Sequence, residues 1–458
     1  QALEGGAGWD TLVLLSANRV MQLGSELGEQ AKELTTEDVL TLVRAYGRTG
    51  QSDSLLYKQV SAMCQVMGKE KFSLEDMGAI LDGFHAVGLR EPQLLRFFSS
   101  TLQQMPLNFS SADGIARMMR VLASSGMQDE IAFRRLCATV LQLPSSSFSA
   151  SSVSCILQAL STANVLDSAL LRRLSEVAQT LELSSLRAPH VVQILGAMTR
   201  ANRKDVKLLE RMGRAVLEME ASSLQGQHIG VIAMAMAEAG YVDTKVLDHL
   251  CQASLQLEPW NFDGTSIAMI VTAYSKLKVW DQQLFARLST VLQQAEQGSL
   301  LALSLKDLGA IVTAYASPEA LDLLLLRKLA GLMQQMDPKT FASPDAVQEV
   351  SVALNAFASA EMQPTALALS QTLAYHLKPH VGGVTAQAMI NIVRRAARAE
   401  SLGSSKTLAR EAHRKRLRAI GARREGGVEE EEEGKHMAEG SMDVGRGSDR
   451  SLFLGLGV

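Results

Sequence analysis

The chain has 458 residues, a formal net charge of −3, 47% hydrophobic residues and 20% charged residues. These values are ordinary for a folded protein, and the near-neutral charge excludes a global basic field that would attract nucleic acid. The sequence contains no apolar run of about 18 residues, so it predicts neither a membrane-spanning helix nor a membrane partner.

Residues 1–30 are predicted to contain an N-terminal capping helix over residues 8–30. From residue 31 onward, apolar residues recur every 38 positions, and each opens a pattern that is apolar at positions 0, 3, 4 and 7. Val39, Leu42, Val43 and Tyr46 illustrate it, with the small Ala45 at position 6. This spacing is one face of an α-helix, here called helix A. The starting residues are Val39, Met77, Ile115, Val153, Val191, Ile229 and Ile267, followed at longer spacing by Leu308, Val350 and Met389.

A second series with the same period consists of acidic residues. Each acid precedes apolar residues near positions +3, +4 and +7, which predicts an N-cap and a second helix, helix B. A row of catalytic carboxylates is the rejected alternative, because caps recur with a repeat and active sites do not. The predicted caps are Asp53, Glu91, Asp129, Asp167, Asp205, Asp243, Asp281 and Asp322.

The connections between the helices carry cap and turn residues. Helix A is preceded by an apolar residue and then Ser or Thr at Leu34-Thr35, Phe72-Ser73, Phe148-Ser149 and Leu303-Ser304. This pairing is typical of a hydrophobic staple with an N-cap. The end of helix A is expected at Gly47 to Gly50, Gly88 and Gly240. Because one helix pair cannot bury its apolar face alone, residues 31–400 predict an all-α, right-handed α-solenoid of about ten helix-turn-helix repeats.

No residue pattern indicates catalysis, a cofactor or a metal site. Cys64, Cys137, Cys155 and Cys251 form no CxxC pair and lie in apolar stretches, so they are interpreted as structural thiols. His376 and His380 are four residues apart, but Pro379 lies between them and no third ligand is evident. The sequence therefore predicts a protein that is not an enzyme and has no small-molecule substrate.

The outward positions +2 and +5 of helix A vary in polarity along the chain. A protein that reads one RNA base per repeat needs polar side chains at such positions. Only some of these positions could read a base, and the central repeats offer apolar or very small side chains, so sequence-specific readout is the weaker form of the RNA hypothesis. The pairs are Thr41/Arg44, Ala79/Asp82, Arg117/Arg120, Cys155/Gln158, Gln193/Gly196, Val231/Met234, Met269/Thr272 and Ala310/Thr313. The apolar side chains of the central repeats favour contact with a protein, or deeper burial. These candidate protein-binding residues are Val231, Met234 and Met269.

Positions +5 and +6 of helix B carry a row of basic residues. Such a row is suited to contact a phosphate backbone, and a solvated surface is an equally weighted alternative. Tyr46, Phe84, Tyr274, Tyr315 and Phe357 occupy position 7 of helix A and are predicted to be core residues. The basic row consists of Lys58, Arg96, Arg134, Arg135, Arg172, Arg173, Arg211, Arg287, Arg327 and Lys328.

The densest basic cluster follows the repeats. Residues 401–424 are predicted to form a basic helical extension, and residues 425–458 an acidic, glycine-rich tail that is extended or disordered unless a partner binds it. We interpret the cluster as a contact with structural RNA, with a solvated extension as the alternative. Its members are Arg394, Arg395, Arg398, Lys406, Arg410, Arg414, Lys415, Arg416, Arg418, Arg423 and Arg424.

The repeat resembles a known family. Phe72 to Leu81 (FSLEDMGAIL) and Leu303 to Val312 (LSLKDLGAIV) share a Phe/Leu-Ser entry, and helix A reads Ile-Leu-x-Ala-Phe/Tyr. Over residues 31–400 this pattern is similar to octotricopeptide and heptatricopeptide repeats, which belong with FAST-kinase-like and RAP proteins. The resemblance implies an organellar protein that binds, matures or stabilises RNA, or that is built into a divergent ribosome. No RAP domain is recognised after the repeats.

Two classes of function follow. The preferred one is an RNA-associated scaffold of mitochondrial gene expression, as a structural component of a divergent mitochondrial ribosome that contacts rRNA and neighbouring proteins. The alternatives are an organellar RNA-maturation or RNA-stability factor and a protein-protein adaptor without RNA contact. The mitochondrial location is implied by the resemblance alone, and the start at Gln1 suggests that a leader is missing.

Overall fold

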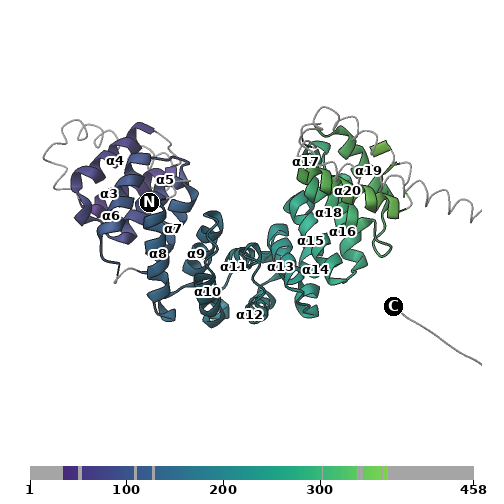
Figure 1. Ribbon diagram of the computed structural model, residues 1–458, viewed down its shortest axis with the longest axis horizontal. Helices are drawn as coiled ribbons and strands as arrows, with labels where there is room; N and C mark the ends of the chain where they lie inside the picture. The colour runs from purple at the N-terminus through teal and green to yellow at the C-terminus, as the bar shows by residue number, and fades with distance from the viewer. Residues whose placement is uncertain are drawn as a thin grey trace, which may run out of the picture. The chain divides into compact units, whose positions relative to one another are not determined.

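The computed structural model describes residues 35–49, 54–107, 111–125, 129–301, 303–337, 340, 344–360, 362, 365–366 and 368–369. All of them belong to Gln1–Arg395, one of two units into which the chain divides. Within the described residues the regular elements are α-helices and short 3-10 helices, without a strand (Figure 1). The predicted capping helix over residues 8–30 and the regions 401–424 and 425–458 lie outside these residues.

The described helices form eight A/B pairs and the first helix of a ninth. The A helices are α3 (Thr36–Thr49), α5 (Leu74–Ala86), α7 (Ala112–Ser124), α9 (Ala150–Thr162), α11 (Ala188–Arg200), α13 (Gly226–Ala239), α15 (Gly264–Leu277), α18 (Leu305–Tyr315) and α20 (Pro344–Ser359). The B helices are α4 (Ser54–Met67), α6 (Pro92–Gln104), α8 (Glu130–Gln142), α10 (Ser168–Thr180), α12 (Val206–Leu217), α14 (Thr244–Gln256), α16 (Gln282–Gln294) and α19 (Leu323–Gln335).

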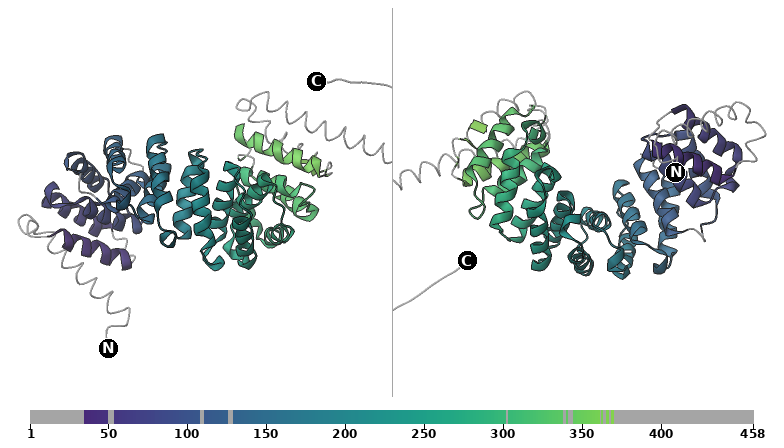
Figure 2. Two further views of the ribbon diagram at one scale, coloured as in Figure 1. Left: turned by 90° about the horizontal axis from the view of Figure 1, so that it is seen from below. Right: turned by 180° about the vertical axis from the view of Figure 1, so that it is seen from behind.

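The pairs stack in sequence order. Each A helix packs against the A helix of the next pair, and each B helix packs against the next B helix (Figures 1 and 2). This arrangement confirms the α-solenoid. The extra short helix α17 (Gln297–Leu301) lies between α16 and α18, and it accounts for the longer spacing before Leu308.

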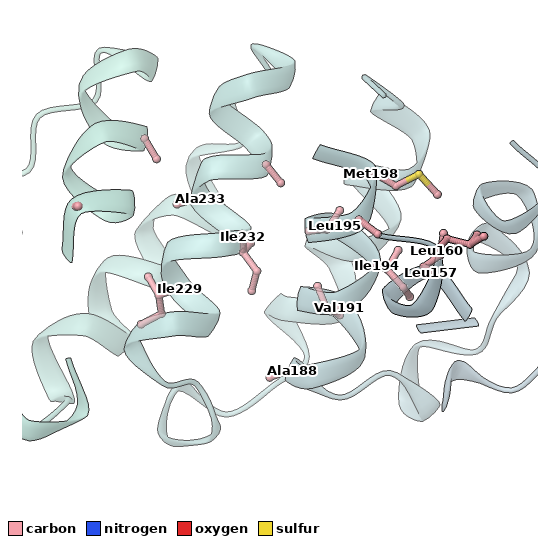
Figure 3. Close-up of a cluster of buried hydrophobic side chains, with 14 of the residues drawn as sticks. Leu157, Leu160, Ala188, Val191, Ile194, Leu195, Met198, Ile229, Ile232 and Ala233 are labelled. Atoms are coloured by element: carbon pink, nitrogen blue, oxygen red, sulfur yellow. The ribbon is translucent and has the colours of Figure 1, made fainter. Parts of the chain in front are cut away.

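The A helices bury the predicted stripe. Ile267, Ile270, Val271 and Tyr274 of α15 are each at most 2% exposed. Figure 3 shows the same stripe on α9, α11 and α13 merging into one apolar cluster. The aromatic residues of position 7 are core residues as predicted where the structure describes their side chains, at Phe84, Tyr274, Tyr315 and Phe357. Burial of these side chains is the main favourable term that holds neighbouring repeats together.

Six of the predicted aspartates are N-caps. Asp129, Asp167, Asp205, Asp243, Asp281 and Asp322 each precede a B helix and accept a hydrogen bond from an amide of its first turn. Glu91 occupies the same position without a side-chain bond, and Pro92 begins that helix. Asp53 lies outside the described residues.

The cap aspartates also link neighbouring repeats, which the sequence did not predict. Asp205 accepts hydrogen bonds from Ser175 Oγ at 2.6 Å and from Gln179 Nε2 at 3.2 Å, both on the preceding B helix. Asp322 is bonded in the same way by Ser289 at 2.5 Å and Gln293 at 3.0 Å. Ser99 and Gln103 repeat the arrangement at Asp129. One carboxylate therefore caps its own helix and anchors the helix before it.

The A helices end at a left-handed residue in several repeats. Gly88 and Gly240 have φ angles of 72° and 67°, as their predicted turn role requires. Asn164, Asn202 and Lys278 occupy the same position of their repeats with φ angles of 54°, 51° and 56°. Gly47 was predicted to mark such a turn and instead lies inside α3, because that helix continues to Thr49.

Two A helices begin with a cap that titrates. His190 Nδ1 accepts a hydrogen bond from the Arg187 amide at 3.3 Å, and His228 Nδ1 accepts one from the Gln225 amide at 3.2 Å. A protonated imidazole has no free Nδ1 lone pair, so each cap requires the neutral ring. Burial lowers the pKa of both histidines below the ordinary value of 6.5.

We expect this chain to lose stability as the pH falls through about 6.5, because the unfolded state then takes up protons that the folded caps exclude. The stabilisation is complete above that pH. The variant His190→Gln/His228→Gln retains an acceptor at the third helical position without a titrating group. The free energy of unfolding, measured with urea at pH 7.5 and at pH 5.5, should fall more between the two pH values for the parent than for the variant. Equal falls would contradict the prediction.

Candidate nucleic-acid interface

The stacking of the B helices separates the basic row into two sets. Position +6 points toward the preceding repeat, and position +5 points away from it. The residues at +6 are Arg135, Arg173, Arg211, Arg287 and Lys328, and all five are half-buried. The residues at +5 are Lys58, Arg96, Arg134, Arg172 and Arg327, and all five are exposed.

The +6 cations cap the carboxyl end of the preceding B helix. Arg173 donates to the Leu143 carbonyl at 3.0 Å, and Arg287 donates to the Leu257 carbonyl at 3.0 Å. Arg211 donates in the same way to Leu181. The last carbonyls of a helix lack partners within it and carry partial negative charge, so a cation there is favourable.

The two end members of this set make more than one such bond. Arg135 donates to the carbonyls of Leu102 and Met105, each at 2.6 Å. Lys328 Nζ donates to the carbonyls of Leu292, Gln293 and Ala295 at 3.1, 2.7 and 3.1 Å. Backbone oxygens thus hold the charged groups of all five +6 residues, and a phosphate contact by their remaining donors stays a prediction.

Replacing Arg173 with methionine is expected to lower the free energy of unfolding by about 1–2 kcal/mol, since a charge-assisted bond to a helix end is lost. Arg172→Met changes the neighbouring +5 residue, which is exposed, and is expected to stay within about 0.5 kcal/mol of the parent. Urea unfolding monitored by circular dichroism compares the two. If the two substitutions lower the free energy of unfolding equally, the hydrogen bond from position +6 does not contribute to stability.

The +5 residues remain available to a partner, with one exception. Arg134 forms an ion pair with Glu130 one turn earlier. Lys58, Arg96, Arg172 and Arg327 have no ion pair among the described residues. A phosphate contact at these positions stays a prediction.

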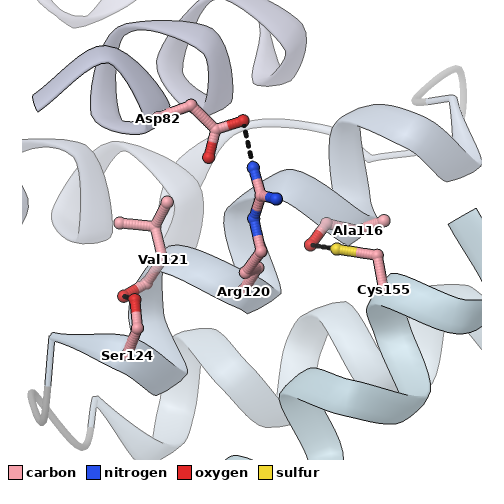
Figure 4. A network of polar contacts seen from close by, with 6 residues as sticks. All are labelled: Asp82, Ala116, Arg120, Val121, Ser124 and Cys155. Atoms are coloured by element: carbon pink, nitrogen blue, oxygen red, sulfur yellow. Dashed lines mark hydrogen bonds and ion pairs between the residues drawn. The ribbon is translucent and has the colours of Figure 1, made fainter. Parts of the chain in front are cut away.

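The outward face of the A helices has a polar hollow over α7, α9 and α11. It has a volume of about 310 Å³, and Arg117, Arg120, Gln158, His190 and Gln193 are among its lining residues. Arg120 is paired with Asp82 of α5 at 2.7 Å (Figure 4). Cys155 Sγ lies beside it and donates to the Ala116 carbonyl at 3.4 Å. Arg117 has no ion pair among the described residues, so the hollow offers amides and this guanidinium group, beside the Asp113 carboxylate, to a polar ligand.

Further along, the same face is apolar. Val231, Met234 and Met269 are half-buried. Val231 lies over Gly196 of the preceding A helix, and Met269 lies over Gly230. The absence of a side chain at each glycine lets the neighbouring residue sink toward the backbone. Part of this apolar strip is thus used in stacking, and the half-exposed remainder is what a protein partner can contact.

The thiols fit a structural role. Burial raises the pKa of Cys64 to about 12 and of Cys137 to about 11, and it raises the pKa of Cys155. Thiols with such pKa values stay protonated at neutral pH and are poor nucleophiles and metal ligands. In the part of the chain that the structure describes, no group of three or more potential metal ligands comes together. His376 and His380 lie outside it.

The cluster from Arg394 to Arg424 also lies outside the described residues, so its contact with RNA stays a prediction. Among the helices that the structure describes, none is both long and apolar enough to cross a bilayer. The candidate interface in the described repeats therefore comprises the exposed cations of helix B and the hollow on the A helices.

The stacked pairs define an α-solenoid repeat protein. A family model described as RNA-editing substrate-binding complex 6 protein matches residues 5–217, somewhat less than half of the chain. The match ends at the last residue of α12, so it includes the polar hollow and excludes the apolar strip. The sequence is thus similar to that family over its first five helix pairs.

No curated protein matches the sequence. Solved structures do match, among them a circular tandem repeat protein with novel repeat topology and enhanced subunit contact surfaces. That protein is 14% identical, the alignment covers 89% of this chain and 91% of that chain, and the TM-score is 0.18. At this TM-score the likeness carries no structural argument, and the fold assignment rests on the helix pairs themselves.

Proposed function

We propose that this protein is a non-enzymatic scaffold that associates with RNA in an organellar ribonucleoprotein assembly. The observation that carries the proposal is the match of residues 5–217 to the RNA-editing substrate-binding complex 6 family. The polar hollow with Arg117, Gln158 and Gln193 lies within the matched residues. Amide and guanidinium groups on a rigid helical surface are suited to hydrogen-bond bases and phosphates.

Within this proposal the assembly is a mitochondrial ribosome and the RNA is rRNA. A permanently assembled solenoid needs both RNA-facing and protein-facing surfaces. The helix B cations supply the first, and the half-exposed apolar strip of Val231, Met234 and Met269 supplies the second. A role in RNA maturation or stability uses the same RNA-facing surface and is the nearest alternative. The repeat pattern that resembles octotricopeptide and heptatricopeptide proteins supports a mitochondrial location.

A protein-protein adaptor is the second candidate. The observation that favours it is the set of apolar side chains left exposed at the start of some B helices. Ile131 is 68% exposed and Leu324 is 69% exposed, and both occupy the second residue of their helix. In this alternative the basic residues serve solubility.

Sedimentation of the native protein from a detergent-lysed organelle extract tests the proposal. The extract is run on a gradient at low and high salt, with and without ribonuclease. We expect the protein to migrate with ribosomal RNA at both salt concentrations and to shift to lighter fractions after ribonuclease. Migration in a heavy complex that ribonuclease leaves intact would overturn the RNA association and favour the adaptor.

A further inference from the structure

The turns that join each A helix to its B helix carry a group of exposed cations in three successive repeats. Because A helices stack on A helices and B helices on B helices, the turns of α11–α12, α13–α14 and α15–α16 lie along one edge of the solenoid. We call this the turn edge and define it by Arg200, Arg203, Lys204, Lys207, Lys245 and Lys278. All six side chains are exposed, and none has an ion pair or side-chain hydrogen bond within the described residues.

Three of these cations occupy positions that local helix energetics disfavour. Lys207 is the second residue of α12 and Lys245 the second residue of α14, at the positive end of the helix dipole. Lys278 has a φ angle of 56° at the position where adjoining repeats place Asn202 and Gly240. A left-handed conformation is costly for lysine and not for glycine. Helix stability therefore does not account for the choice of lysine at these three sites.

The acidic groups on the same edge are already engaged. Asp205, Asp243 and Asp281 cap the B helices. Glu238 is paired with Lys276 at 2.6 Å. These carboxylates keep their negative charge, but in residues 200–207, 238–245 and 276–282 seven Lys and Arg residues stand against four carboxylates, so the turn edge carries a net positive charge.

The opposite edge has the opposite charge. The connections from B helix to the next A helix expose acids in the same repeats, at Glu182, Glu218, Glu220, Glu258 and Asp263, with Arg187 as the opposing cation. The two edges are separated by the length of a 13-residue helix, about 20 Å. A polyanion is therefore attracted to one edge of the solenoid and repelled from the other.

Half-exposed aromatic rings lie among the cations. Tyr241 precedes α14, and Trp280 precedes α16, where its ring packs at 5.3 Å from that of Phe285. Each ring is fixed by the turn that holds it, since the Tyr241 hydroxyl also lies 3.3 Å from the Asp243 carboxylate. Fixed aromatic faces between cations are the elements of a platform for single-stranded nucleic acid.

We infer that the turn edge binds single-stranded RNA, with the six cations on the phosphates and the rings of Tyr241 and Trp280 stacked on bases. This site rests on the proposed association with RNA and adds a surface for it outside the helix B row and the polar hollow. It lies partly beyond the residues that match the family model, which end at Leu217.

The test compares two matched triple variants of the full chain. The edge variant is Lys207→Gln/Lys245→Gln/Lys278→Asn, with one cation removed from each of three repeats. The control is Lys69→Gln/Arg187→Gln/Lys306→Gln, which removes three cations that lie outside the turn edge, the helix B row and the polar hollow. Binding of a fluorescein-labelled 20-nucleotide uridine oligomer is measured by anisotropy over a range of potassium chloride concentrations.

We expect the edge variant to bind the oligomer at least tenfold more weakly at moderate salt. The slope of log affinity against log salt should also become shallower by about 2, because each of the three lost phosphate contacts contributes about 0.7. The affinity of the control variant for the oligomer should differ from that of the parent by less than twofold. An unchanged edge variant, beside a parent that binds, would overturn the turn-edge site and leave the RNA association intact. A parent that binds no RNA at low salt would overturn both.

A second measurement tests the stacking. The variant Trp9→Phe/Trp260→Phe leaves Trp280 as the single tryptophan. Its fluorescence should be quenched by the unlabelled uridine oligomer with the same midpoint as the anisotropy curve. Unchanged fluorescence at saturation would overturn the stacking on Trp280.

Discussion

Replacing Asp205 with alanine is expected to lower the free energy of unfolding by about 3 kcal/mol. The carboxylate accepts from the Leu208 amide at 3.1 Å as an N-cap, which contributes about 1 kcal/mol. It also accepts from Ser175 and Gln179 of the preceding repeat. Ser175 is buried, so its hydroxyl is left without a partner in the variant, and a lost bond to a charged group costs about 1.5–3 kcal/mol.

Asp167→Ala is the matched control for that substitution. Asp167 caps α10 through the Ala169 and Leu170 amides, and the preceding B helix places Cys137 where other repeats place the bonding serine. We expect Asp167→Ala to lower the free energy of unfolding by about 1 kcal/mol, which is the contribution of an N-cap alone. Urea unfolding and hydrogen exchange of the α10 and α12 amides provide the comparison. Equal losses at the two sites would contradict an inter-repeat role for the carboxylate.

Gly226→Ala and Gly331→Ala are expected to change stability in opposite directions. A Cβ atom at Gly226 would lie 2.8 Å from the Asn261 carbonyl oxygen and 2.8 Å from the Phe262 ring, both in the connection to α15. Because a backbone oxygen can move aside only if the chain itself shifts, we expect Gly226→Ala to lower the free energy of unfolding by about 1–3 kcal/mol. A Cβ atom at Gly331 meets nothing within 4 Å in the middle of α19. Alanine at position 331 should raise the free energy of unfolding by about 1 kcal/mol, because alanine has a higher helix propensity than glycine.

Differential scanning calorimetry of the two glycine variants measures these shifts on one scale. The effect at Gly226 should be centred on the contact between α13 and α15, so exchange of the amides in those two helices should rise more than exchange in α5 or α7. A neutral Gly226→Ala would mean that the repeats separate slightly to admit a methyl group. That outcome would contradict tight stacking at this junction.

If the turn edge and the polar hollow both contact RNA, the strand has two anchor surfaces on one solenoid. The hollow is formed by outward side chains of α7, α9 and α11, and the turn edge begins at the end of α11. Arg200 in the last turn of α11 is therefore on the same helix as Gln193 and His190 of the hollow. A strand that leaves the hollow along α11 reaches the turn edge without leaving the protein surface.

The sequence by itself determined the repeat and its caps. A 38-residue spacing of apolar positions and aspartates predicts helices whose buried faces and N-termini depend on residues within one helix or its first turn. The structure confirms those faces at positions such as Ile267 and Ile270, and it confirms the caps at Asp167 and Asp205. Local periodicity carries this information because every repeat obeys the same geometry.

Only the tertiary structure decided what the exposed charges do. Arg172 and Arg173 are neighbours in sequence, and nothing local shows that Arg173 reaches the Leu143 carbonyl 30 residues earlier while Arg172 faces solvent. The same holds for Lys207, Lys245 and Lys278, which the stacking of separate turns brings to one edge. The direction of a side chain and the identity of its neighbours depend on how one repeat lies on the next, and that relation is absent from the pattern of a single repeat.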